Sequence, residues 1–177
     1  MPNLHSRPGP AVAFARPGCI CYSAARQVMK IKAMPSHQRL LLDNQLCFAL
    51  YSTSLAMTSL YKPLLEPLGL TYTQYLIMLI LWEQDGMGLK DIAERLGQQS
   101  GALTPVIKRL ESQGLVHRRR SDEDERSLVI SLTEAGKTME QQALEVNQCI
   151  ISHCGMEIPE LQALKQLLND LRHKLGS

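Results

Sequence analysis

Cys47 is a candidate reactive residue in this sequence, because a cysteine thiolate is a nucleophile and a target of oxidants. It lies in an apolar helical stretch, where a cysteine is most often a small, buried hydrophobic residue. Tyr51 follows four residues later, one helical turn along the same face, and its hydroxyl could donate toward the sulfur and stabilise the thiolate. Two interpretations stay open at this point, a core cysteine and a reactive thiol.

Tyr61 lies 14 residues after Cys47, nearly on the same face of a helix. Along a straight helix the two residues are roughly 21 Å apart, so Tyr61 cannot contact the cysteine of its own chain. Two copies of the helix packed antiparallel about a two-fold axis would bring Tyr61 of one chain to Cys47 of the other. Tyr72 is a weaker third candidate beside Tyr51 and Tyr61. Ordinary packing of amphipathic aromatic residues is the alternative for all three.

A second set of residues has types and spacing suited to reading DNA. A short helix over residues 89–96, a turn at Gly97 and a second helix over residues 100–113 predict a helix-turn-helix. Small and polar residues at the start of the second helix let its backbone approach the major groove, and basic residues further along suit phosphates. An ordinary helical hairpin is the alternative. The candidate DNA contacts in this helix are Ser100, Gly101, Ala102, Thr104, Lys108 and Arg109.

A basic β-hairpin follows the helix pair. Two short β-favouring segments, residues 115–118 and 127–132, flank a polar tip over residues 119–126. A tip arginine suits the narrow minor groove, and Asp124 could pair with Arg126 and orient its guanidinium. A solvated run of charges is the alternative. The candidate DNA contacts in this hairpin are Arg118, Arg119, Arg120, Asp124 and Arg126.

Length and composition are consistent with one domain. The chain has 177 residues, 45% apolar and 20% charged, which excludes disordered and collagen-like classes. No apolar run approaches the ~18 residues of a membrane span, so we expect a soluble protein without a membrane partner. Residues 1–33 hold five of the 19 basic residues and no acidic one, so the rest of the chain is mildly acidic. Nucleic-acid binding therefore needs a local basic patch.

Five irregularly spaced cysteines predict a reduced, cytoplasmic protein, not a disulfide scaffold. Two cysteine and histidine clusters lack a zinc-binding spacing, so we expect no metal and no cofactor. These clusters are Cys19 and Cys21 with His5, and Cys149 and Cys154 with His153.

Helical patterns flank the predicted DNA-reading elements. Helical periodicity covers residues 37–65 and 73–84, residues 85–88 are predicted to form a turn, and Thr133 is predicted to cap a long helix. A last helix carries leucines at the spacing of a packing seam. Residues 1–38 are expected to be an N-terminal extension, disordered or a start-site artefact, with Met34 as a candidate start.

Several segments together resemble a known family. The stretch from Asp124 to Thr133 resembles the D-x-R…L-T wing signature of MarR-type regulators. Residues 42–48, 61–65, 70–76 and 100–105 resemble the OhrR branch of that family, which senses organic hydroperoxides. The resemblance covers about residues 40–175. It implies a mainly α fold with a small β wing (α+β), a winged helix-turn-helix with N- and C-terminal dimerisation helices.

The resemblance also implies a domain organisation and a mechanism. Residues 39–177 would form the MarR-type domain, with a DNA-binding core at about 72–132 and dimerisation helices at 39–66 and 133–175. A homodimer would repress genes from an inverted-repeat operator in double-stranded DNA until an organic hydroperoxide oxidises Cys47. Tyrosines from both subunits would line the thiol pocket. Apolar neighbours of the cysteine favour alkyl or lipid hydroperoxides, and these neighbours are Leu46, Phe48, Leu50 and Met57.

In some relatives a second cysteine resolves the oxidised thiol as a disulfide across the dimer. Cys149 and Cys154 both fall in the matching region, about 140° apart on a helix, and the sequence does not decide between them. Such a disulfide would need helix movement, which would change the spacing of the two recognition helices. Two alternatives remain for the function: a MarR-type regulator relieved by a non-covalent aromatic ligand, and a thiol peroxidase. We expect a protein that is not an enzyme, because no peroxidase motif accompanies Cys47.

Overall fold

The computed structural model describes residues 35, 37–120 and 127–176 of the chain. The predicted wing-tip residues Asp124 and Arg126 lie outside this range. The chain divides into two units, Met1–Tyr51 and Ser52–Ser177, and the boundary falls within helix α2, Leu46–Leu65.

In the first unit, two 3-10 turns precede the start of α2: η1, Gln38–Leu40, and η2, Leu42–Asn44. The continuous helix that the periodicity predicts from residue 37 is therefore wrong over its first nine residues. Leu41 and Gln45 adopt extended backbone conformations, which interrupt the helical hydrogen-bond ladder. The Gln45 side chain instead donates Nε2 to the carbonyls of Arg39 at 2.7 Å and Leu41 at 3.0 Å. Local side-chain hydrogen bonds of this kind compete with helix formation.

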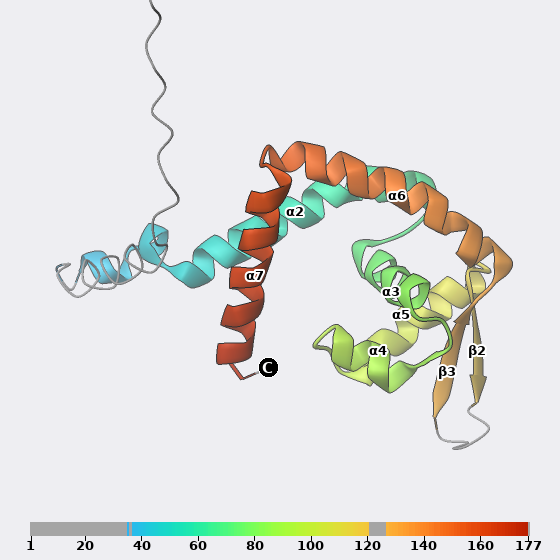
Figure 1. Ribbon diagram of the computed structural model, residues 1–177. Helices are drawn as coiled ribbons and strands as arrows, with labels where there is room; N and C mark the ends of the chain where they lie inside the picture. Colours follow the sequence, from blue (N-terminus) through green and yellow to red (C-terminus); the bar gives the residue numbers. More distant parts are fainter. Residues whose placement is uncertain (1–34, 36, 121–126, 177) are drawn as a thin grey trace, which may run out of the picture. The chain divides into compact units, whose positions relative to one another are not determined.

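In the second unit, the predicted helix and strand segments form with boundaries within about two residues of the expected ones. After α2 the chain continues through η3, Glu66–Leu68; α3, Tyr72–Glu83; α4, Leu89–Arg95; α5, Ser100–Ser112; β2, Val116–Arg120; β3, Leu128–Leu132; α6, Glu134–Cys154; and α7, Ile158–Lys174 (Figure 1).

A further strand, β1, Met87–Gly88, completes a three-stranded antiparallel sheet in the order β1-β3-β2. Met87 and Arg118 both pair with Ile130, from opposite sides of β3. The sequence predicts only a turn over residues 85–88, and this is wrong for its last two residues. Asp85 helps to hold the edge strand, because its Oδ1 accepts a hydrogen bond from the Leu132 amide at 2.7 Å. A strand of two residues has no detectable alternation, so the pairing partner defines it.

The core of the second unit lies between α3, α5 and the sheet (Figure 1). Helix α3 contributes a fully buried stripe that includes Ile77, Met78 and Leu81. Burial of each such side chain stabilises the fold by about 1.5–3 kcal/mol. This packing fixes one face of α5, which carries Leu103, Ile107 and Leu110 into the core, and leaves the other face exposed.

The start of α6 is hydrogen-bonded to the end of α5. Thr133 caps α6, as predicted, by accepting the Gly136 amide at 3.0 Å, and its hydroxyl donates to the Gly114 carbonyl at 2.7 Å. The Thr133 amide donates to the Leu115 carbonyl at 3.0 Å. Trp82 Nε1 donates to the Gly136 carbonyl at 2.8 Å. The orientation of α6 is therefore linked directly to the segment that follows α5.

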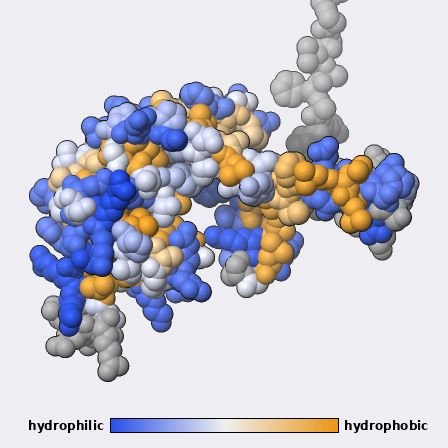
Figure 2. Space-filling model, turned by 180° about the vertical axis from the view of Figure 1, so that it is seen from behind, coloured by the Kyte–Doolittle hydropathy of each residue, from blue (hydrophilic) through white to orange (hydrophobic). Residues whose placement is uncertain are grey.

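Helix α7 presents an apolar face that the described part of the chain leaves exposed. All residues of α7 are described, and none of them is buried. Figure 2 shows apolar side chains gathered along this helix, and the exposed ones include Ile158, Leu164, Leu167 and Leu168. Across the described residues, no single helix is long and apolar enough to cross a membrane; one bent pair, Leu46–Leu68 with Tyr72–Glu83, meets the length and composition criteria.

Candidate nucleic-acid interface and redox site

The side chains at the start of α5 are small and accessible to solvent, as a helix that enters a DNA groove requires. Gly101 and Ala102 are exposed, and a Cβ atom added at Gly101 would meet nothing within 4 Å. The Thr104 hydroxyl donates to the Ser100 carbonyl at 3.1 Å, which leaves its oxygen lone pairs available as acceptors. The predicted phosphate contacts Lys108 and Arg109 are both exposed. The structure thus places every predicted contact of this helix near or on its solvent face.

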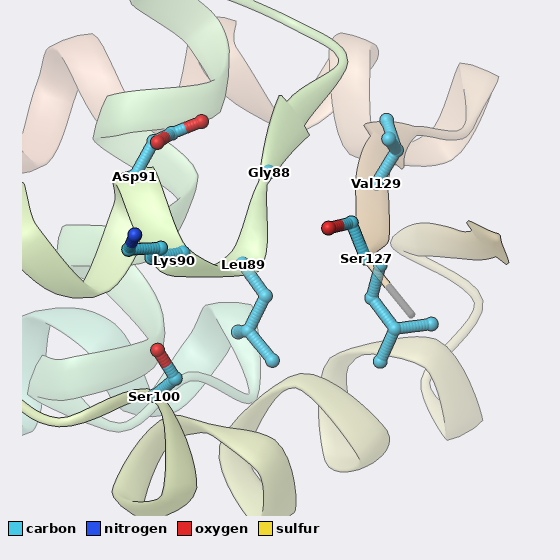
Figure 3. Close-up of a pocket in the computed structure, with 8 residues that line it drawn as sticks. Gly88, Leu89, Lys90, Asp91, Ser100, Ser127 and Val129 are labelled. Atoms are coloured by element: carbon cyan, nitrogen blue, oxygen red, sulfur yellow. The ribbon is translucent and has the colours of Figure 1, made fainter. Parts of the chain in front are cut away.

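A cavity of about 480 Å³ lies where the starts of α4 and α5 approach the start of β3, at the tip end of the hairpin. Figure 3 shows Lys90, Ser100 and Ser127 among the side chains around it, contributed by α4, α5 and the segment before β3. Lys90 adds a cation close to the exposed start of α5. Lys90 was not among the predicted DNA contacts, because along the sequence it is an ordinary surface lysine of an amphipathic helix.

The three arginines of β2 have different surroundings. Arg119 and Arg120 are exposed, as expected for residues that contact a polyanion. Arg118 is half-buried and pairs with Glu111 of α5: its Nε and Nη2 both lie 2.6 Å from Glu111 Oε2. This ion pair ties the wing to the recognition helix. Glu111 was not among the predicted site residues, because strand alternation does not show which helix a strand residue faces.

Three tyrosines form an aromatic cluster in the second unit. The ring of Tyr61 lies 4.9 Å from that of Tyr72 and 5.5 Å from that of Tyr75, between centroids. The structure therefore brings together two of the three predicted tyrosines and adds Tyr75, which is 1% exposed and was not among the predicted site residues. Tyr51 belongs to the first unit and is 61% exposed.

The Tyr61 phenol is a strong candidate proton donor. Burial, followed by the neighbouring Tyr75, Tyr72 and Cys154, raises the pKa of Tyr61 to about 12. Each of these effects disfavours the phenolate. The hydroxyl therefore keeps its proton throughout the physiological range and can donate a hydrogen bond to an anion.

The three cysteines in the described part of the chain are free thiols in different surroundings. Cys47 is exposed in the first turn of α2, within the first unit. Cys154 is half-buried at the end of α6 and interacts electrostatically with Tyr61. Cys149 is exposed and lines a separate cavity of about 280 Å³ with residues that include Pro63, Leu64, Pro67 and Leu68. Within the described ranges, no group of three or more His, Cys, Asp and Glu side chains is arranged to hold a metal ion.

The helix pair α4–α5 followed by the β2–β3 hairpin defines a winged helix-turn-helix protein, the class of fold that the sequence predicts. The model of the MarR family matches residues 70–128, which run from two residues before α3 to the first residue of β3. The chain belongs to the MarR family.

Relatives within this family share most of their length with the chain. The organic hydroperoxide resistance transcriptional regulator of Bacillus subtilis (strain 168) is 46% identical over 134 residues, which cover 76% of this chain and 91% of the relative. The solved structure of reduced AbfR bound to DNA is 37% identical, with a TM-score of 0.69, and covers 80% of this chain and 96% of its own. A structure of disulfide-formed AbfR is 33% identical, with a TM-score of 0.54, over 87% and 95% of the two chains.

Proposed function

We propose that this protein is a DNA-binding transcriptional repressor that leaves its operator when an organic hydroperoxide oxidises Cys47. One observation carries the proposal: a chain 46% identical to an organic hydroperoxide regulator has a free thiol at Cys47 and an open recognition helix beside exposed wing arginines. We place the protein in the cytoplasm, where such a regulator meets chromosomal DNA.

The active form is a homodimer on an inverted repeat. The apolar face of α7 supports this assembly, because exposed apolar side chains in such a row need a partner surface. A two-fold axis would place two copies of α5 in successive major grooves, about one helical turn of DNA apart. It would also give Cys47 a tyrosine cluster from the other chain, as the antiparallel arrangement of two α2 helices requires.

The redox step begins with the Cys47 thiolate. The sulfur attacks the terminal oxygen of the hydroperoxide, an S–O bond forms and the O–O bond breaks, so that cysteine is oxidised to sulfenic acid and the peroxide is reduced. The alkoxide that leaves takes a proton and departs as an alcohol. Tyr61, which keeps its proton, donates a hydrogen bond to the thiolate of the partner chain and lowers its basicity. Tyr72 lies against Tyr61 and supports its position.

We assign the resolving role to Cys154. A second thiolate would attack the sulfenic sulfur, form an S–S bond and release the oxygen as water after protonation. Cys154 is the cysteine of α6 whose thiol interacts with Tyr61, the residue proposed to face Cys47 of the other chain. Cys149 lies five residues earlier, where it lines the cavity beside Pro63 and Leu64, and it serves as the matched control.

The primary test compares wild type with Cys47→Ser. We expect the reduced forms of both to bind the same DNA with equal affinity, and cumene hydroperoxide to release only the wild type. About one peroxide should be consumed per Cys47 in the absence of a thiol reductant, as expected for a sensor. Release of the variant at the wild-type peroxide concentration would refute the redox mechanism. Release by an aromatic acid under reducing conditions would point instead to non-covalent control.

Non-reducing electrophoresis tests the assignment of the resolving thiol. After peroxide treatment, Cys154→Ser should lose the covalent dimer, and Cys149→Ser should keep it. The opposite pattern would assign the role to Cys149, and a dimer in neither wild type nor variants would indicate a route through a small-molecule thiol.

A further inference from the structure

Gln74 is the one buried polar side chain of the described residues, at 1% exposure. Its Oε1 accepts the Thr71 amide at 2.8 Å, which caps α3, and its Nε2 donates to Oε1 of Gln113 at 2.9 Å. A buried amide is costly when it lacks partners, so the position of Gln113 matters to Gln74.

Gln113 uses both ends of its own amide. Its Oε1 accepts from Gln74, and its Nε2 donates to the Gly69 carbonyl at 2.8 Å. Gly69 has a φ of 65°, which a residue with a side chain adopts only with strain, so the loop before α3 presents its carbonyl in a defined direction. Gln113 is the C-terminal cap residue of α5. One side chain thus joins the end of the recognition helix to the segment of residues 69–74.

These two hydrogen bonds restrict α5 in a way that apolar packing does not. Leu103, Ile107 and Leu110 hold α5 through burial, which has little directional preference. The planar amide of Gln113 accepts only a narrow range of angles at both ends. The 13 residue steps from Ser100 to Gln113 span about 20 Å along the helix. A tilt of about 5° at the Gln113 end therefore moves the DNA-reading end by ~1.7 Å, more than base-edge hydrogen bonds tolerate.

We propose that Gln113 is a positioning residue for operator recognition, which sets the angle of α5 against the segment of residues 69–74. This inference rests on the DNA-binding half of the proposed function, and does not depend on its redox half. The residue touches no DNA in this role, because it lies at the opposite end of α5 from the groove-reading residues. Its effect is on sequence-specific binding, and phosphate contacts made by Lys108, Arg109 and the wing arginines should persist.

The test uses reduced, full-length protein. An operator is first selected from random duplexes with wild type, and binding to it is compared with binding to a scrambled duplex of equal length. The variants are Gln113→Leu, which loses both hydrogen bonds, and Gln113→Glu, which can still accept from Gln74 but cannot donate to Gly69. Gln84→Leu is the matched control, because Gln84 is an exposed glutamine at the C-terminal cap of α3.

We expect Gln113→Leu to weaken operator binding about tenfold or more and to leave scrambled-duplex binding within twofold of wild type. Gln113→Glu should give an intermediate loss, and Gln84→Leu should match wild type. Thermal melting of the same samples separates this role from a stabilising one. A lowered melting temperature with an unchanged ratio of operator to scrambled affinity would overturn the inference. If wild type selects no sequence, the DNA-binding half of the proposed function fails, and this inference with it.

Discussion

Replacement of Gly136 by alanine tests the junction that joins α6 to the end of α5. A Cβ atom at this position would lie 2.2 Å from the Leu115 carbonyl oxygen and 3.2 Å from Leu132 Cδ2. The first of these contacts is with a backbone atom, which cannot rotate away as a flexible side chain can. The start of α6 would have to move by about 1 Å to restore an ordinary contact distance.

The cost has two parts. Overpacking in a dense region costs about 1–3 kcal/mol. The displacement would also weaken the hydrogen bonds from Thr133 to the Leu115 carbonyl and from Trp82 to the Gly136 carbonyl, at about 1 kcal/mol each. Alanine regains about 1 kcal/mol over glycine in a helix. The net loss is therefore about 2–4 kcal/mol, equivalent to a fall in melting temperature of roughly 6–12 °C for a chain of this size.

Thermal melting at fixed protomer concentration measures this effect, since the stability of a dimer depends on concentration. Gly101→Ala is the matched control, because a Cβ atom there meets nothing within 4 Å. This control should gain about 0.5–1 kcal/mol from the reduced entropy of the unfolded chain. A Gly136→Ala protein that melts within 1 °C of wild type would refute the steric reasoning.

Three further predictions follow from single contacts. Tyr61→Phe should reduce the loss of stability that the wild type shows between pH 10 and about 12. The raised pKa of Tyr61 keeps the phenol protonated in the folded wild type, whereas the same group in the unfolded chain ionises from about pH 10. The free energy of unfolding of the wild type therefore falls as pH rises through this window. Melting curves at pH 9–12 measure it, and parallel declines in the two proteins would contradict it. A double-mutant cycle of Glu111→Gln and Arg118→Gln should give a coupling of about 0.5–1 kcal/mol that shrinks at high salt, since both side chains are partly exposed; zero coupling at low salt would show that the pair does not hold the wing. Trp82→Phe should cost about 1 kcal/mol through the lost bond to Gly136, measured by urea unfolding, and an unchanged midpoint would argue against that bond.

Periodicity and local capping determined most of the elements from sequence alone. The pair of short helices, the two wing strands and the Thr133 cap are all confirmed, because each depends on residues a few positions apart. The start of α2 at Leu46 was missed because Gln45 diverts its hydrogen-bonding capacity to nearby carbonyls, which a hydrophobic pattern does not register.

The tertiary structure decided which distant residues meet. Glu111 pairs with Arg118, Tyr75 joins Tyr61, and Gln113 reaches Gly69 because the chain returns to the same place after intervening segments whose path the sequence pattern does not specify. Burial and directional hydrogen bonds depend on that path, whereas helical periodicity does not. The winged helix-turn-helix class could therefore be predicted from residues along the chain, while the contacts that orient α5 required the folded protein.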